Sequence, residues 1–296
     1  MSTAAIGRIV VGYDGSEPAD AALERSLGLA ARLGSPVEVV TSWRWPITWS
    51  TLPVANSWSP LHDAEEIRQQ AVDLVERHGP LPVEVTTRSA EGGTPEVLLD
   101  AASDAGLLVV GSRGRGGFRG LLLGSVSAAC IQHATCPVLV DRGRAATGTD
   151  GSGASGAGGA VVVGVDGSPE SGRALRFAIT LARGLGLPVR TITTWQWPEA
   201  LNRDEPPFDH WSPEQDALAT ASPALEAAED LIDDDDDVTS DLVEGRPAEV
   251  LLDASRDAAL LVLGSRGLGG FRGLLVGSVT QECAQHASCP VVVHRS

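Results

Sequence analysis

Short runs of Val, Ile and Leu alternate along this chain with longer segments whose apolar residues recur at helical spacing. Between the first two runs, Ser16 and Pro18 are typical of a helix start and Gly34 of a helix end. Strands that alternate with helices in this way predict βαβ units, and therefore an α/β fold with a parallel sheet. In the first half the predicted strands lie near residues 9–12, 37–41, 83–87, 107–110 and 138–141.

The whole pattern occurs twice. "VVGYDGS" at 10–16 matches "VVGVDGS" at 162–168, and "EVLLDA" at 96–101 recurs at 249–254. The separation is about one domain length, so the repeat indicates a tandem duplication of a domain. We expect one domain at 1–144, a flexible linker rich in Gly, Ser and Ala at 145–159, and a second domain at 160–296.

In each half, one glycine-rich loop follows the fourth predicted strand: "GSRGRGGFRGLLLGSV" at 111–126 in the first half and "GSRGLGGFRGLLVGSV" at 264–279 in the second. Glycine lets a ligand approach the backbone, and the Gly-Ser pair near the end of each loop stands where a helix begins. Unpaired N–H groups and the helix dipole attract anions there, so the loops predict phosphate binding. The alternative is that the glycines only form turns. The loop is also not a dinucleotide-binding GxGxxG fingerprint, because the third glycine position falls on Arg119.

An aspartate directly follows the first predicted strand of each half, Asp14 in one and Asp166 in the other. If the strand order reverses between the first and fourth strands, the aspartate and the glycine loop meet at adjacent carboxyl ends. Open α/β sheets bind their ligands at that point. An aspartate there can accept a hydrogen bond from a ribose hydroxyl, which predicts a nucleotide; capping of a turn is the alternative.

The spacings Gly111-x2-Gly114-x9-Gly124-Ser125 and Gly264-x2-Gly267-x9-Gly277-Ser278 resemble the ATP-binding signature Gx2Gx9G(S/T) of the universal stress protein family. The similarity extends in both halves from the first strand to the closing "CPVLV" and "CPVVV". It implies two tandem five-stranded parallel-sheet α/β sandwiches, Rossmann-like, with strand order 3-2-1-4-5. It also implies one ATP, ADP or AMP in each half, with Mg²⁺ or Mn²⁺ on the phosphates.

The resemblance assigns residues to parts of the nucleotide. Asp14 and Asp166 take the adenosine side, and Ser42 and Thr194 supply a backbone contact to adenine. The ribose and phosphate positions that the resemblance implies are Gly111, Gly114, Gly124 and Ser125 in the first half, and Gly264, Gly267, Gly277 and Ser278 in the second. The loops themselves add the candidates Arg113, Arg115, Gly116 and Val126, and in the second half Arg266, Gly269 and Val279.

The arginines of the two loops differ. The first loop contains Arg113, Arg115 and Arg119, whereas the second contains Arg266 and Arg272 and has Leu268 at the position of Arg115. Charge-assisted hydrogen bonds to phosphate are strong, so the sequence predicts weaker triphosphate binding in the second half. Solvated surface arginines are the equally weighted alternative.

Composition excludes several classes of function. The net charge of −17 argues against nucleic acid as a partner, and a chain without lysine has neither a Walker P-loop nor Schiff-base chemistry. No apolar run is long enough to cross a membrane, and the first residues do not resemble a secretion signal, so we expect a cytoplasmic protein.

Three further patterns have simpler explanations than ligand binding. The Cys-x-x-His-x-x-Cys spacing at 130–136 lacks a fourth zinc ligand, so we expect its cysteines to be buried apolar residues. The aspartates at 233–237 lack the spacing of a calcium loop and are interpreted as solvated charge. The tryptophan pairs at 43–45 and 195–197 are expected to anchor irregular loops, with stacking on adenine as the alternative.

The leading hypothesis is a nucleotide-dependent regulator of stress, dormancy or signalling. One alternative is a slow ATP hydrolase or phosphotransferase, although no motif places a general base. Another is an interaction scaffold that does not depend on nucleotide. Because the last strand of each half is predicted at a sheet edge, we also expect the two domains to pair and the chain to form a homodimer.

Overall fold

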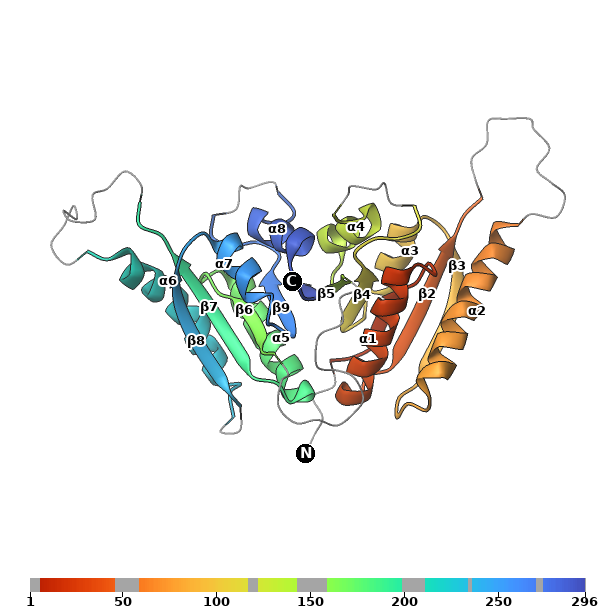
Figure 1. Ribbon diagram of the computed structural model, residues 1–296, viewed down its shortest axis with the longest axis horizontal. Coiled ribbons are helices and arrows are strands. Elements are labelled where there is room, and N and C mark those ends of the chain that lie inside the picture. Colours follow the sequence, from red (N-terminus) through yellow and green to blue (C-terminus); the bar gives the residue numbers. More distant parts are fainter. Residues whose placement is uncertain are drawn as a thin grey trace. The chain divides into compact units, whose positions relative to one another are not determined.

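The computed structural model divides the chain into two compact units, residues 1–143 and 144–296. It describes residues 6–45, 59–116, 122–142, 159–198, 211–233, 236–269 and 274–295. The predicted linker at 145–159 lies outside these ranges except for Gly159. Each unit alternates strands with helices, which confirms the predicted α/β class (Figure 1). No helix in the described ranges is long and apolar enough to span a membrane.

The first unit contains a parallel sheet with strand order β3-β2-β1-β4-β5. Its elements are β1 (Ile9–Gly12), α1 (Glu17–Leu33), β2 (Val37–Trp43), α2 (Pro60–His78), β3 (Val85–Glu91), α3 (Thr94–Ala101), β4 (Leu107–Gly111), α4 (Ser125–His133) and β5 (Val138–Asp141).

The second unit repeats this arrangement with strand order β8-β7-β6-β9-β10. Its elements are β6 (Val161–Gly164), α5 (Pro169–Leu185), β7 (Val189–Trp195), α6 (Pro213–Glu229), β8 (Val238–Glu244), α7 (Pro247–Ala254), β9 (Leu260–Gly264), α8 (Ser278–His286) and β10 (Val291–His294).

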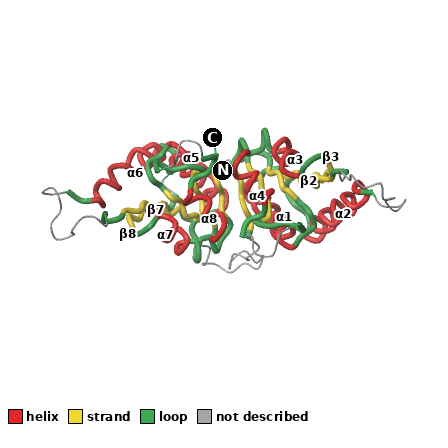
Figure 2. The backbone as a smooth tube through the Cα atoms, turned by 90° about the horizontal axis from the view of Figure 1, so that it is seen from above, coloured by secondary structure: helices red, strands yellow, loops and turns green. Residues whose placement is uncertain are grey.

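Helices cover both faces of each sheet. In the first unit α1 and α2 pack on one face and α3 and α4 on the other, and α5 with α6 and α7 with α8 do the same in the second (Figure 2). The central strands are therefore excluded from water on both sides, and Val10, Leu108, Val163 and Leu261 are fully buried. This explains why β1, β4 and their counterparts are continuous apolar runs rather than alternating ones.

The third strand differs from the prediction. It was expected at 83–87 but runs from Val85 to Glu91, and β2 extends two residues beyond the predicted 41. The two strands pair in register from Val37 with Val85 to Trp43 with Glu91. Because β3 lies at the sheet edge, five of its seven residues are polar and none of the seven is buried, so an apolar run is a poor guide to its limits.

The predicted ends of α1 are confirmed. Ser16 is the N-cap residue, and Gly34 ends the helix in the left-handed conformation, with φ of 64°. The Ser16 side chain does not cap the helix, however, and its hydroxyl donates to Asp14. In the second unit Ser168 does cap, accepting a hydrogen bond from the Ser171 amide.

All four cysteines are free and buried, as expected of small apolar residues. Burial raises the pKa of the Cys130 thiol to about 12 and that of Cys136 to about 11. Both thiols are therefore protonated at neutral pH. Among the described residues, no group of three or more His, Cys, Asp or Glu side chains could hold a metal ion.

Candidate functional site

The aspartate and the glycine loop of each unit meet where the strand order reverses. In the first unit β1 pairs with both β2 and β4, so the chain leaves β1 and β4 at neighbouring carboxyl ends. We call the Asp14 turn, the loop 111–116 and the start of α4 the first cradle. The second cradle consists of the Asp166 turn, the loop 264–269 and the start of α8.

Asp14 ties the two loops of the first cradle together. Its Oδ2 accepts a hydrogen bond of 2.8 Å from the Arg115 amide, and its Oδ1 accepts from the Ser16 amide at 3.1 Å and the Ser16 hydroxyl at 2.6 Å. A carboxylate has about four acceptor positions, so Asp14 can still accept from a ligand hydroxyl.

The second cradle repeats this tether. Oδ2 of Asp166 accepts from the Leu268 amide at 2.8 Å, and its Oδ1 accepts from the amide and hydroxyl of Ser168 at 3.0 and 2.6 Å. The tether uses the backbone N–H of the loop residue, so it is the same whether that residue is arginine or leucine.

The glycines of the loop have different reasons to be glycine. A Cβ at Gly114 would lie 2.3 Å from Oδ2 of Asp14, and one at Gly111 would lie 2.8 Å from the carbonyl oxygen of Pro18 in α1. These two glycines are required by the fold itself. At Gly116 and at its counterpart Gly269, a Cβ would meet nothing within 4 Å. Packing among the described residues therefore does not explain these two glycines.

Helix α4 begins with backbone donors that the helix cannot use. Its N-cap is Gly124, which has no side chain to cap the amides, and the first bond within the helix runs from the Ala128 amide to the Gly124 carbonyl at 2.9 Å. The amides of Ser125 and Val126 precede that bond and remain available to an acceptor. Helix α8 begins in the same way, with Gly277 before Ser278 and Val279.

Sequence reasoning missed a buried hydroxyl that holds each helix start in place. Ser127 Oγ donates to the Gly111 carbonyl at 2.7 Å, and Thr280 Oγ1 donates to the Gly264 carbonyl at 2.8 Å. Each bond fixes the first turn of the helix over the end of the preceding strand. A hydroxyl three residues after the N-cap glycine in both halves was the available signal.

The arginines of the two cradles have different surroundings. Arg113 and its counterpart Arg266 are both exposed, and Arg266 lies 3.7 Å from the carboxylate of Glu170. Glu170 occupies the position of Pro18 in the first unit. The second cradle therefore lacks the counterpart of Arg115 and also has a carboxylate beside its remaining described arginine. Arg119, Arg272 and the rest of 117–121 and 270–273 lie outside the described residues.

Ser42 and Thr194 lie in β2 and β7, near the carboxyl ends of these strands. The Ser42 hydroxyl donates to Thr94 Oγ1 at 2.7 Å, at the start of α3. Its side chain is therefore already paired with a neighbour in the fold. The backbone contact to adenine that the family resemblance assigns to Ser42 and Thr194 remains a prediction.

The cradles do not form a cation site of their own. The aspartate oxygens already accept N–H and O–H donors, and no cluster of metal-ligating side chains occurs among the described residues. A divalent cation prefers several oxygen ligands at once. A magnesium or manganese ion would thus depend on the phosphates for its ligands.

The fold and these loops define a class: a tandem α/β protein with an aspartate-tethered glycine loop at the point of strand reversal in each unit. The sequence model of the universal stress protein family matches residues 5–142 and 159–295. The chain belongs to the universal stress protein family, which confirms the resemblance noted from its glycine spacings.

Relatives match over nearly the full chain. Universal stress protein Rv2005c of Mycobacterium tuberculosis is 32% identical over 292 residues, which cover 97% of this chain and 96% of the relative. A universal stress protein of Mycolicibacterium smegmatis is 32% identical over 296 residues, with the same coverage. The crystal structure of a universal stress protein from Archaeoglobus fulgidus superposes with a TM-score of 0.67 at 19% identity, covering 99% of this chain and 97% of that one.

Proposed function

We propose that each unit binds an adenine nucleotide, and that occupancy makes the protein a nucleotide-dependent regulator in stress, dormancy or signalling. In this proposal the ribose lies at Asp14 or Asp166, and the phosphates lie on the glycine loop and the helix start. The observation that supports it most directly is that both units repeat an uncapped helix start beside a glycine loop tethered by an aspartate.

The donors of each cradle suit phosphate. Two helix amides, the positive end of the helix dipole and an arginine act on the same anion in the first cradle. Gly116 and Gly269 leave room for the ligand beside the loop backbone. The second cradle binds a triphosphate more weakly, because Leu268 replaces an arginine and Glu170 lies close to Arg266.

Regulation is favoured over catalysis. The chain has no lysine, no motif places a general base, and in this proposal the carboxylate of each cradle holds the loop and the ribose. Binding to the folded state alone raises stability by mass action, which is enough for a signal. Four free thiols suit a reducing compartment, so we place the protein in the cytoplasm.

Calorimetry with ATP, ADP, AMP and GTP tests this proposal. We expect adenine nucleotides to bind to two sites of unequal affinity and to raise the melting temperature. The decisive variant is Gly116→Ala, because its added methyl group meets nothing in the ligand-free protein. We expect an unchanged melting temperature without nucleotide and about tenfold weaker ATP binding at the first site, which corresponds to ~1.4 kcal/mol.

Gly269→Ala is the matched variant and acts on the second site alone. Absence of any heat or thermal shift with all four nucleotides would refute the proposal. Binding that both glycine variants leave unchanged would place the nucleotide elsewhere on the protein.

A further inference from the structure

Arg115 joins the first cradle to helix α2. Its backbone N–H is bound to Asp14, while Nη2 of its guanidinium donates to the Gly15 carbonyl at 3.2 Å and to Oε1 of Gln70 at 3.3 Å. The guanidinium also packs on Gly15, where an added Cβ would lie 2.5 Å from Nη2. One residue therefore contacts the cradle with its backbone and α2 with its side chain.

A second polar contact lies beside Arg115. Tyr13 is 4% exposed, and its hydroxyl donates to Oδ1 of Asp20 in α1 at 2.6 Å. Burial is the main cause that raises the pKa of Tyr13, and the hydrogen bond to Asp20 is the second. The positive charges of Arg115 and Arg77 lower this pKa. We call Tyr13, Asp20, Gln70, Arg77 and Arg115 the polar cluster; in it Tyr13 is bonded to Asp20 and Arg115 to Gln70, and the charges of Arg115 and Arg77 act on Tyr13.

The second unit lacks every member of this cluster. By the repeat, its counterparts of Tyr13, Asp20, Gln70, Arg77 and Arg115 are Val165, Gly172, Pro223, Asp230 and Leu268. Helix α6 instead approaches the turn directly: a Cβ at Gly167 would lie 2.0 Å from the Thr220 carbonyl oxygen, and one at Gly172 would lie 3.7 Å from Ala224 Cβ. The contact of α6 with the turn is therefore made by backbone and small apolar groups.

We propose that Arg115 lets the first unit, and not the second, report the phosphate charge of its nucleotide to the helix beside it. This inference rests on the proposed function. Phosphate attracts a guanidinium more strongly than the neutral oxygens of Gly15 and Gln70 do, because both partners are charged. A triphosphate in the first cradle draws Arg115 away from Gln70, and α2 loses its tie to the cradle. A monophosphate competes less strongly.

Hydrogen exchange of α2 and α6, followed by mass spectrometry with and without ATP or AMP, measures this response. Amide exchange reports local opening, which rises when a tie is lost. We expect ATP to speed exchange in α2 about fivefold, the effect of one lost hydrogen bond, and AMP to do so less. We expect no acceleration in α6.

Two variants of α2 separate this cause from a general loosening of the helix. Gln70→Leu removes the acceptor of Arg115 from an exposed position, so exchange in α2 should be fast without nucleotide and ATP should add nothing. Gln69→Leu makes the same chemical change one residue away, where the side chain donates to Asp73 at 2.9 Å. This control should keep the ATP response.

Native mass spectrometry of the same samples distinguishes failure of the inference from failure of the proposed function. If the unaltered protein binds no ATP, the proposed function is wrong. Suppose that ATP binds. If it accelerates exchange in α2 equally in the unaltered protein and in Gln70→Leu, or accelerates α2 and α6 equally, the proposed role of Arg115 is wrong.

Discussion

A serine in place of Gly124 should stabilise the empty protein and weaken its binding of ATP. Gly124 has the extended backbone of an N-cap residue, with φ of −72° and ψ of 155°. An added Cβ would lie 3.4 Å from Cα of Arg113 and from the carbonyl oxygen of Ser112, an ordinary contact distance. The serine hydroxyl can therefore accept a hydrogen bond from an amide in the first turn of α4, one of the donors that we assign to phosphate.

The two effects have different sizes. Serine is a better N-cap than glycine by only a few tenths of a kcal/mol, so the free energy of unfolding should rise by about 0.3 kcal/mol. A hydrogen bond to a charged group is worth about 1.5–3 kcal/mol. The serine side chain can rotate away from the amide, so we expect the lower end of that range, or about tenfold weaker binding of ATP at the first site.

Isothermal calorimetry gives the affinities, and denaturation without nucleotide gives the stability. Gly124→Ala is the control, because it adds the methyl group without the oxygen. Alanine is a poorer N-cap than glycine, so this variant should lose about 0.7 kcal/mol of stability. Gly277→Ser makes the matched change in α8, where the added Cβ would be 3.5 Å from Cα of Arg266. It should affect only the second site.

Two results would contradict this reasoning. If Gly124→Ser stabilises the protein and leaves the affinity for ATP unchanged, the amides of α4 do not hold phosphate. If Gly124→Ala weakens binding as much as Gly124→Ser does, the cause is the bulk of the methyl group and not competition for the amides.

Two further predictions concern the core and the sheet edge. The Cys130 thiol should react with iodoacetamide at pH 9 roughly 500-fold more slowly in the folded protein than in denaturant, because burial raises its pKa from 9.0 to about 12 and so lowers the thiolate fraction. Stability should accordingly fall as pH rises above the ordinary thiol pKa, where only the unfolded chain ionises. Arg88→Asp should lower the free energy of unfolding, measured by urea denaturation, by ~0.5–1 kcal/mol, because it places a carboxylate beside Glu38. The triple variant Arg8→Ala/Glu38→Arg/Arg88→Asp copies the residues of the second unit and should recover this loss. Equal stability of the single and triple variants would contradict the pairing.

The parts of this fold that the sequence predicts well are those where one physical requirement dominates. Strands β1 and β4 are buried on both faces, so their apolar runs mark them clearly, and parallel topology then brings Asp14 to the glycine loop. The edge strand β3 has no such signal. The link from Arg115 to Gln70 joins residues 45 positions apart with no motif between them. Such a contact depends on where the folded backbone places two side chains, which no local pattern predicts.

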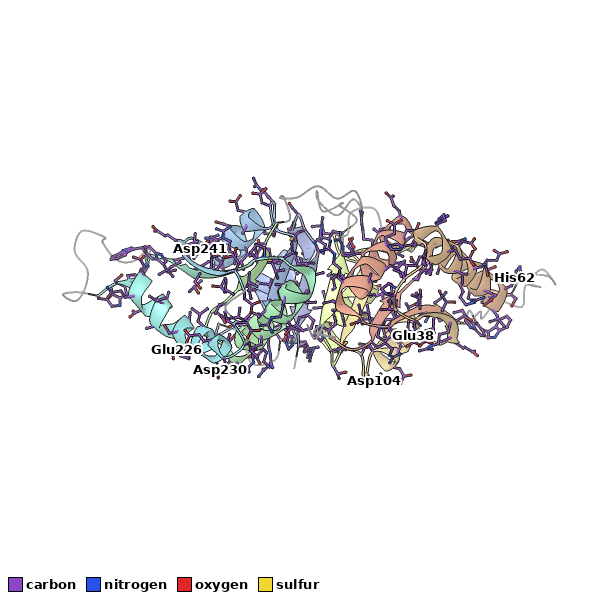
Figure 3. All side chains as sticks on the ribbon, turned by 90° about the horizontal axis from the view of Figure 1, so that it is seen from below. Glu38, His62, Asp104, Glu226, Asp230 and Asp241 are labelled. Atoms are coloured by element: carbon purple, nitrogen blue, oxygen red, sulfur yellow. The ribbon has the colours of Figure 1, made fainter. Side chains whose placement is uncertain are left out.

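The two units have kept the same backbone tethers but have changed their polar side-chain pairs. Beside the edge strand, Arg88 of β3 is bound to Glu38 of β2, whereas in the second unit Asp241 of β8 is bound to Arg190 of β7, with the charges reversed; Glu38 and Asp241 are labelled in Figure 3. Pairing of β2 with β8 would place Glu38 beside Asp241, and pairing of β7 with β3 would place Arg190 beside Arg88. Like charges on neighbouring strands are unfavourable, so the reversal restricts each edge strand to its own unit. The same divergence at Arg115 and Leu268 leaves two cradles with one backbone design; among the described loop residues, Arg115 of the first reaches the neighbouring helix and Leu268 of the second has no polar group to do so.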